Sequence, residues 1–373
     1  MKRTINYPFL FVSAILLFFG FIFLATLSAP ASIKAFENAN YYLFHQLIAL
    51  FIGLVLALIV IRIPMDFIKK TSLFLFIINI LLTMAVFMPI IGTEFWGAKR
   101  WISIGSNTFQ PSEFLKITAI LFLCSLISDR LSENYKKERI FSIKRGYYNL
   151  TNLLLPFFLI LSVIAIILYL QRDLSTLGII SISLVVIYFL SETPLWHTIL
   201  TFAIGLAGAI LFIAIEPYRI QRLLTLLRPE SDPLGRGFQI KQSLIAMGSG
   251  GVLGEGLGLS TQKFGFLPQA MSDSVFAILG EELGMVGSTI VVLLFLLFLY
   301  FGFKIAVSAK DRFSRLVAVG ITSWIVFQAF INIASTIGVF PLSGIPLPFF
   351  SYGGTHLITE IVGIALLLKI SRN

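Results

Sequence analysis

Apolar runs of about 18 to 25 residues recur along almost the whole chain, and they limit its fold more than any other feature. Each run is long enough to cross a hydrocarbon core of about 30 Å as a helix. Hydrophobic residues fill 57% of the 373 positions and charged residues only 12%, which excludes an ordinary soluble domain and a disordered chain. The runs lack the alternation of polar and apolar residues that marks membrane barrel strands. We therefore predict an all-α polytopic membrane protein.

We expect about ten membrane-spanning helices in a single transmembrane domain over residues 1–373. The first apolar run exceeds the 7–15 residues usual for the apolar core of a signal peptide, so we interpret it as a retained first span. The one cysteine, Cys124, excludes an internal disulfide. The expected spans lie near residues 8–28, 43–61, 72–91, 112–128, 153–170, 174–190, 196–215, 274–303, 314–338 and 353–370.

The distribution of Lys and Arg predicts how these helices are oriented. With the N-terminus inside, seventeen of the 28 basic residues fall in cytoplasmic segments and five in short outer loops and helix mouths. Short cytoplasmic loops are enriched in Lys and Arg, whereas long loops contribute little to orientation. Both termini should therefore be cytoplasmic, and the long loop near residues 216–273 should be extracytoplasmic. Membrane orientation also accounts for the net charge of +10 without a nucleic-acid partner.

The long loop is too long to be a structureless connection. Residues Tyr218–Leu227 mix Arg and Leu at helical spacing, which is typical of a helix lying in the membrane interface. A second short helix is expected over Gln239–Met247. The glycine-rich segment 248–258 that follows is either a flexible turn or a backbone that approaches a ligand closely, and the sequence leaves both open.

Asp273 stands where the long loop re-enters the membrane, a position suited to a general base. The alternative is that it caps the next helix. Glu281 and Glu282 follow within the apolar run, so at least one should meet a cavity or a basic partner. The same helix carries small residues at 3-4-3 spacing, which suits close helix packing: Ala277, Gly280, Gly284 and Gly287.

More charged residues lie at the expected outer helix mouths. Lys99 and Arg100 stand outside against the charge bias, which suggests a functional reason for keeping them. Glu113 and Lys116 share one helix face and form either a local ion pair or part of a site. Asp173 is either a helix cap or a further site residue.

Several blocks of residues occur in a characteristic order along the chain. They are Gly97-Ala98-Lys99-Arg100-Trp101, Gln110-Pro111-Ser112-Glu113, Gln171-Arg172-Asp173-Leu174, Ser272-Asp273 through Gly280-Glu281-Glu282-Leu283-Gly284, and Gly344-Ile345-Pro346-Leu347-Pro348-Phe349-Phe350-Ser351-Tyr352-Gly353-Gly354. As a set they resemble the SEDS family (shape, elongation, division and sporulation), whose members polymerise cell-wall glycan. The segments Gln242–Ala246, Gly248–Gly251 and Gln262-Lys263 resemble the division branch, FtsW, more than the elongation branch, RodA.

The resemblance implies a peptidoglycan glycosyltransferase that polymerises lipid II, with Asp273 as the catalytic base. It implies substrate contacts from Lys99, Arg100, Glu113, Lys116, Asp173 and Lys263, with cations facing the pyrophosphate. Implied partners are a class B penicillin-binding protein transpeptidase of the FtsI type, other divisome membrane proteins and membrane lipid. No cofactor is certain, and a divalent cation, Mg²⁺ or Mn²⁺, is left open. The implied location is the cytoplasmic (inner) membrane, with the active site on its extracytoplasmic face.

The chain also departs from the family pattern. Arg172 stands where Pro is usual, Ser175 where Gly is usual, and Met271-Ser272 where His-Thr is common. Thr355-His356 replaces the usual Ser-Ser, and Glu360 occupies a position where we expect an amide.

Two other classes of function remain open on the sequence alone. In a transporter or flippase of lipid-linked precursors, Glu281, Glu282 and Glu360 would be coupling or gating residues. In a non-catalytic division scaffold, Asp273 would be inert.

Overall fold

The computed structural model describes most of the chain. The described residues are 5–89, 91–95, 98–105, 107–130, 150–191, 195–215, 217–228, 230, 232–233 and 235–372. Gly97 of the first family block and the basic segment 131–149 lie outside them.

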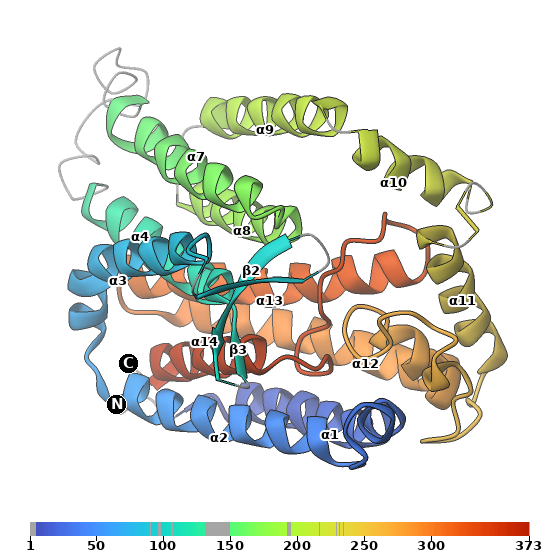
Figure 1. Cartoon of the computed structure of the whole chain (residues 1–373). Coiled ribbons are helices and arrows are strands. Elements are labelled where there is room, and N and C mark those ends of the chain that lie inside the picture. Colours follow the sequence, from blue (N-terminus) through green and yellow to red (C-terminus); the bar gives the residue numbers. More distant parts are fainter. Residues whose placement is uncertain are drawn as a thin grey trace.

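The described chain is mainly helical, and its helices overlap the ranges expected from hydropathy (Figure 1). The third helix, Met65–Ala85, begins seven and ends six residues before the expected span 72–91, so that expected boundary was wrong. Eight helical segments are long and apolar enough to cross a membrane, which confirms a polytopic helical membrane fold. They are α1 (Tyr7–Phe36), α2 (Tyr41–Arg62), α3 (Met65–Ala85), α4 (Pro111–Arg130), the π turn η1 (Leu150–Leu154) continued by α7 (Leu155–Leu170), α12 (Val275–Ser308), α13 (Arg312–Thr336) and α14 (Gly354–Arg372).

Two further apolar helices coincide with expected spans but are shorter in apolar length. They are α8 (Leu174–Leu190), with 17 residues, and α9 (Leu195–Ile215), whose apolar stretch is Ile199–Gly208. The count of ten spans therefore stays a prediction. The backbone N–H of Asn6 donates to Ser371 Oγ at 3.2 Å, so both ends of the described chain lie on one side of the bundle, as an even number of spans requires.

Burial separates the central helices from the outer ones. In α13 and α14, 83% of the most apolar window is buried inside the protein, and in α4 78%. In α2 and α3 the share is only 22% and 28%, because these helices expose their large apolar side chains outward, as lipid-facing helices do. In Figure 1, α12, α13 and α14 run between the layer of α1 and α2 and the layer of α3, α4, α7 and α8.

A small antiparallel sheet lies between α3 and α4, and the sequence analysis did not predict it. Its strands are β1 (Gly92–Phe95), β2 (Ala98–Ile104) and β3 (Asn107–Phe109), in the order β1-β2-β3. Successive side chains of a strand point to opposite faces, so Lys99 and Arg100 project to different sides of this sheet. Lys99 pairs across the sheet with Glu94, and only Arg100 turns toward the helices.

The long loop carries both helices expected in it, α10 (Pro217–Leu227) and α11 (Arg236–Ser249), followed by the 3₁₀ turn η3 (Gln262–Phe264). Pro229, which punctuates the loop in sequence, is outside the described residues. The glycine-rich segment after α11 packs on the first turns of α12. Backbone N–H groups of Glu255 and Gly256 donate to the carbonyls of Glu281 and Glu282 at 2.9 and 3.0 Å.

One small residue of α12, Gly284, has a different neighbour from the one expected, whereas Gly280 packs against Met247 of α11. Gly284 has φ +66°, a left-handed conformation, and interrupts the helix there. A Cβ on Gly284 would lie 2.4 Å from the backbone nitrogen of Gly254. The expectation of packing against another membrane helix was wrong at this position, because loop backbone occupies the space and supplies hydrogen bonds where the helix opens.

Candidate active site

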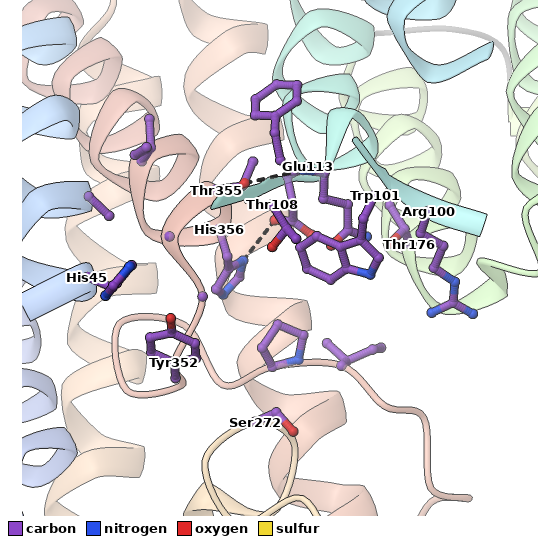
Figure 2. A pocket seen from close by; sticks show the side chains of 18 of the residues that line it. His45, Arg100, Trp101, Thr108, Glu113, Thr176, Ser272, Tyr352, Thr355 and His356 are labelled. Atoms are coloured by element: carbon purple, nitrogen blue, oxygen red, sulfur yellow. Dashed lines mark hydrogen bonds and ion pairs between the residues drawn. The ribbon is translucent and has the colours of Figure 1, made fainter. Parts of the chain in front are cut away.

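A cavity of about 690 Å³ lies between α2, the strands β2 and β3, α4, the start of α8 and the loop that joins α13 to α14. Figure 2 shows its polar side chains converging from these elements. Ile48 and Ile52 on the outward side of α2 also line it, and both are largely exposed. The cavity thus joins a polar interior to the lipid-facing surface, as a site for an amphipathic substrate requires.

Lys116 and Glu113 form a buried ion pair in the cavity wall. The Lys116 ammonium is 2.7 Å from Glu113 Oε2, and the two side chains are only 3% and 6% exposed. The spacing of three residues on α4 brings them together. Lys116 also donates to Gln328 Oε1 at 3.1 Å, and its ammonium lies 4.9 Å from the centre of the Trp324 ring. Glu113 and Lys116 therefore form a local ion pair and also line the cavity, so the two interpretations offered by the sequence are compatible.

His356 extends this pair into a buried network of four charged groups. Its Nδ1 is 2.8 Å from Glu113 Oε2, and its Nε2 is 2.7 Å from Glu360 Oε1 (Figure 2 draws the first contact). Glu360 Oε2 accepts from the backbone N–H of Phe349 at 3.0 Å. Two of the three positions at which α14 departs from the family pattern, His356 and Glu360, are thus partners, four residues apart on one helix face. This explains the carboxylate that the sequence left without a role.

Asp173 lies at the centre of a second polar cluster in the cavity wall. Its side chain accepts from the backbone N–H of Thr176 at 3.4 Å and so caps α8, as the structural alternative predicted. Ser112 Oγ and Gln110 Nε2 donate to the same carboxylate at 3.1 and 3.2 Å. Arg100 Nη1 lies 3.7 Å from Asp173 Oδ1. Asp173 therefore caps a helix and also places a cation in the cavity wall.

Arg100 is held by main-chain oxygens as well. Its guanidinium donates to the carbonyl of Gln171 at 3.5 Å and to the carbonyl of Arg172. The side chain keeps 30% exposure, so part of the guanidinium fork stays available to a ligand.

Asp273 is half-buried at the edge of the cavity, beside two residues that line it, Ser272 and Gly344. Its Oδ2 would lie 4.0 Å from a Cβ on Gly344. Burial raises the pKa of the Asp273 carboxyl above its ordinary value. The N-cap position of α12 is Ser274, and no side chain caps that helix, so the structure does not support the helix-cap alternative for Asp273.

The backbone around Asp273 is fixed by α13 and by the loop between α13 and α14. Asn332 Nδ2 donates to the main-chain oxygen of Asp273 at 2.8 Å. The backbone N–H of Tyr352 donates to the oxygen of Met271 at 2.8 Å, and Ser351 Oγ donates to the oxygen of Ser272. These bonds join the end of the long loop to the other family block.

The structure places two of the predicted substrate-contacting residues away from the cavity. Lys99 is exposed on the outer face of the sheet. Lys263 is buried, with its ammonium 3.0 Å from Glu282 Oε1, and it also donates to the carbonyl of Gly258 at 2.5 Å. This ion pair confirms the expected basic partner for Glu282. Contacts of Lys99 and Lys263 with substrate stay predictions that the shape of the cavity does not favour.

Sequence reasoning missed Gln328 and Trp324, although a signal for them exists. Trp324, Gln328 and Asn332 recur every four residues on α13, so they share one face of an otherwise apolar helix. Polar side chains on one face of a membrane helix mark a cavity or an internal partner. Here Trp324 Nε1 and Lys116 both donate to Gln328 Oε1.

Within the described ranges, no group of three or more His, Cys, Asp or Glu side chains is arranged to hold a metal ion. The binding of a divalent cation, Mg²⁺ or Mn²⁺, therefore stays an open question.

Comparison with known proteins identifies close relatives over the full length. A family model described as a cell cycle protein, and named for FtsW, RodA and SpoVE, matches residues 7–373. Stage V sporulation protein E of Bacillus subtilis is 36% identical over 97% of this chain and 95% of its own length. A protein named as a probable peptidoglycan glycosyltransferase FtsW, from Buchnera aphidicola, is 36% identical over 94% of this chain and 85% of its own.

Solved structures share the fold. A chain from a study of polymerization and crosslinking by a peptidoglycan synthase complex superposes with a TM-score of 0.75 and 24% identity, over 99% of this chain and 98% of that one. The rod shape determining protein RodA of Thermus thermophilus gives a TM-score of 0.69 and 23% identity, over 99% of this chain and 97% of that one.

Proposed function

Since this chain belongs to the SEDS family, the cell cycle proteins of the FtsW, RodA and SpoVE type, we propose that it is a peptidoglycan glycosyltransferase that polymerises lipid II into glycan strands. The observation that carries the proposal is the cavity, which is open beside the lipid-facing side of α2, is lined by Arg100 and Lys116, and has Asp273 at its edge. A polyprenyl-linked disaccharide needs these three features together: a lipid side, cations for the pyrophosphate and a base for the sugar.

In the proposed reaction, the Asp273 carboxylate takes the proton from the acceptor sugar hydroxyl as its oxygen attacks the anomeric carbon of the donor. The bond from that carbon to the pyrophosphate oxygen breaks, and the lipid pyrophosphate leaves with the electron pair. Negative charge grows on the leaving group, so Arg100 and Lys116 stabilise the transition state more than the ground state. A single displacement of this kind inverts the anomeric configuration.

We place the activity in the cytoplasmic (inner) membrane, with the cavity on the extracytoplasmic side and a role in septal cell-wall synthesis. The excess of Lys and Arg in the expected cytoplasmic segments supports the orientation. The FtsW-named and sporulation relatives support the division branch over the elongation branch. We propose a class B penicillin-binding protein transpeptidase of the FtsI type as the partner, because the structural neighbour comes from a complex that joins polymerization with crosslinking. Other divisome membrane proteins and membrane lipid complete the proposed surroundings.

The transporter alternative loses support from the contacts of its acidic residues. Glu281 accepts from the backbone N–H and the hydroxyl of Thr261 at 2.9 and 3.0 Å, and Glu282 is paired with Lys263. Both carboxylates hold the loop onto α12, and neither lines the cavity.

The test is polymerisation of lipid II by the purified full-length protein with its transpeptidase. Asparagine cannot take a proton at neutral pH but has nearly the shape of aspartate. Asp273→Asn should therefore lower the rate by a factor on the order of 10² or more while the protein keeps its abundance and thermal stability. Asp232→Asn, at a carboxylate that accepts from the backbone N–H groups of Gly235 and Arg236 at the start of α11, is the matched control and should polymerise like the wild type. Near wild-type polymer from Asp273→Asn would reject the acid–base assignment.

A further inference from the structure

The buried network of Lys116, Glu113, His356 and Glu360 contains more charge than a simple ion pair needs. Glu113 Oε2 lies 2.7 Å from the Lys116 ammonium and 2.8 Å from His356 Nδ1, so one oxygen atom serves two partners. His356 Nε2 lies 2.7 Å from Glu360 Oε1. All four side chains are at most 6% exposed.

Charge balance determines the state of the imidazole. A carboxylate oxygen lies within 2.8 Å of each ring nitrogen of His356, and an imidazole between two carboxylates is most stable with a proton on both nitrogens, as an imidazolium. The network then contains two cations and two anions. Gln328 Nε2 also approaches His356 Nε2, at 3.2 Å, but it donates to the carbonyl of Pro346 at 3.1 Å and adds no charge.

This arrangement bears on what happens when an anion enters the cavity. Lys116 would have to turn from Glu113 to the anion. Removing one partner of a buried ion pair is ordinarily strongly destabilising, because it leaves an uncompensated charge. Here Glu113 would keep the imidazolium as its counter-ion on the same oxygen atom.

We propose that His356 is a positioning residue that replaces Lys116 as the partner of Glu113, and so frees the Lys116 ammonium to bind the diphosphate of a polyprenyl-linked donor. Glu360 holds the imidazolium in place, and its bond from the Phe349 N–H fixes the carboxylate. This inference rests on the proposed function for the diphosphate class of the donor. It adds a role for two residues that the family pattern lacks.

The experiment measures binding of farnesyl diphosphate to the purified full-length protein in detergent, with farnesol and inorganic pyrophosphate as separate arms. His356→Ser/Glu360→Gln removes one cation and one anion together, so we expect it to melt within a few degrees of the wild type. We expect its Kd for farnesyl diphosphate to rise at least tenfold, because Lys116 then has no replacement at Glu113. Farnesol should bind both proteins equally.

A third substitution distinguishes this role from a merely structural one. Glu113→Gln added to the double variant removes the anion that retains Lys116, so it should restore the affinity for farnesyl diphosphate. His197→Ser is the matched control, because His197 is buried against Tyr188, at 2.6 Å, outside the cavity.

An unchanged Kd in the double variant, or no recovery with Glu113→Gln, would overturn the inference. Equal loss of farnesol binding would show a collapsed cavity and would also overturn it. If inorganic pyrophosphate binds as tightly as farnesyl diphosphate, Lys116 binds free anions without selecting for the lipid chain. That result would reject the lipid-linked donor as its ligand. If the wild type polymerises lipid II and yet shows any of these outcomes, the inference fails and the proposed function stands.

Discussion

The side-chain amide of Asn332 donates to the main-chain oxygen of Asp273 at 2.8 Å and to that of Ile345 at 2.7 Å. One residue of α13, a mostly buried membrane helix, thus holds two loops that are more than sixty residues apart in sequence. The position of Asp273 at the edge of the cavity is set by α13, not by the helix that follows it. A base on a loop is placed accurately only when a rigid element supports it in this way.

The raised pKa of Asp273 predicts the pH dependence of the reaction. A general base must be ionised, so kcat/KM should fall as the pH drops through the pKa of Asp273, with the midpoint above the ordinary value of 3.8. The effect of pH on the free energy of unfolding has the opposite sign. A carboxyl whose pKa is raised by folding stabilises the folded state when it is protonated, so this group does not cause unfolding at low pH. Rates and melting temperatures measured together would check this, and a midpoint at or below 3.8 would contradict it.

Arg100 should matter more than its neighbour Lys99, because the strand turns them to opposite faces of the sheet. Arg100→Ala should lower kcat/KM for lipid II at least tenfold. Arg100→Lys should recover little, since a single ammonium cannot reproduce the guanidinium fork. Lys99→Ala, one residue away, should have a much smaller effect. Equal losses of kcat/KM in Arg100→Ala and Lys99→Ala would contradict the prediction that only the side chain facing the cavity contributes.

The buried pair of Lys263 and Glu282 should stabilise the loop without setting substrate affinity. Lys263→Met leaves Glu282 without its cation and should destabilise the protein by about 3 kcal/mol. Lys263→Met/Glu282→Gln should recover part of that loss. Thermal unfolding in detergent measures both, and KM at a temperature where the variants are folded should stay near the wild-type value. A large rise in KM in the folded Lys263→Met protein would instead support a substrate contact.

The orientation can be tested with single cysteines in a background that lacks Cys124. Ser260, in the long loop, is a poor labelling position because it is fully buried and its hydroxyl donates to Glu281. Leu253, in the same loop, is 81% exposed, and Leu253→Cys should react with an impermeant thiol reagent outside intact cells. Lys310→Cys, between α12 and α13, should react only after the cells are opened. The reverse pattern would place the cavity on the cytoplasmic side.

Local sequence was enough to predict the helical membrane class, the approximate positions of the helices, the two short helices of the long loop, and Asp273 as the acid to examine. Such features follow from local composition, because a lipid-spanning segment must be apolar along its whole length and satisfy its own backbone hydrogen bonds. The order of the motif blocks also pointed to the family, which the full-length match confirmed.

Which side chains are in contact could be seen only in the folded protein. Glu360 was an unexplained carboxylate until the fold placed His356 between it and Glu113. The sequence suggested a substrate contact for Lys263, and in the structure Lys263 forms an ion pair with Glu282. The sequence suggested that Gly284 packs against a helix, and in the structure it packs against loop backbone. The physical reason is that hydropathy fixes where a helix lies along the chain but not its rotation or its neighbours. Those are set by packing and by the requirement that every buried charge has a counter-charge within reach.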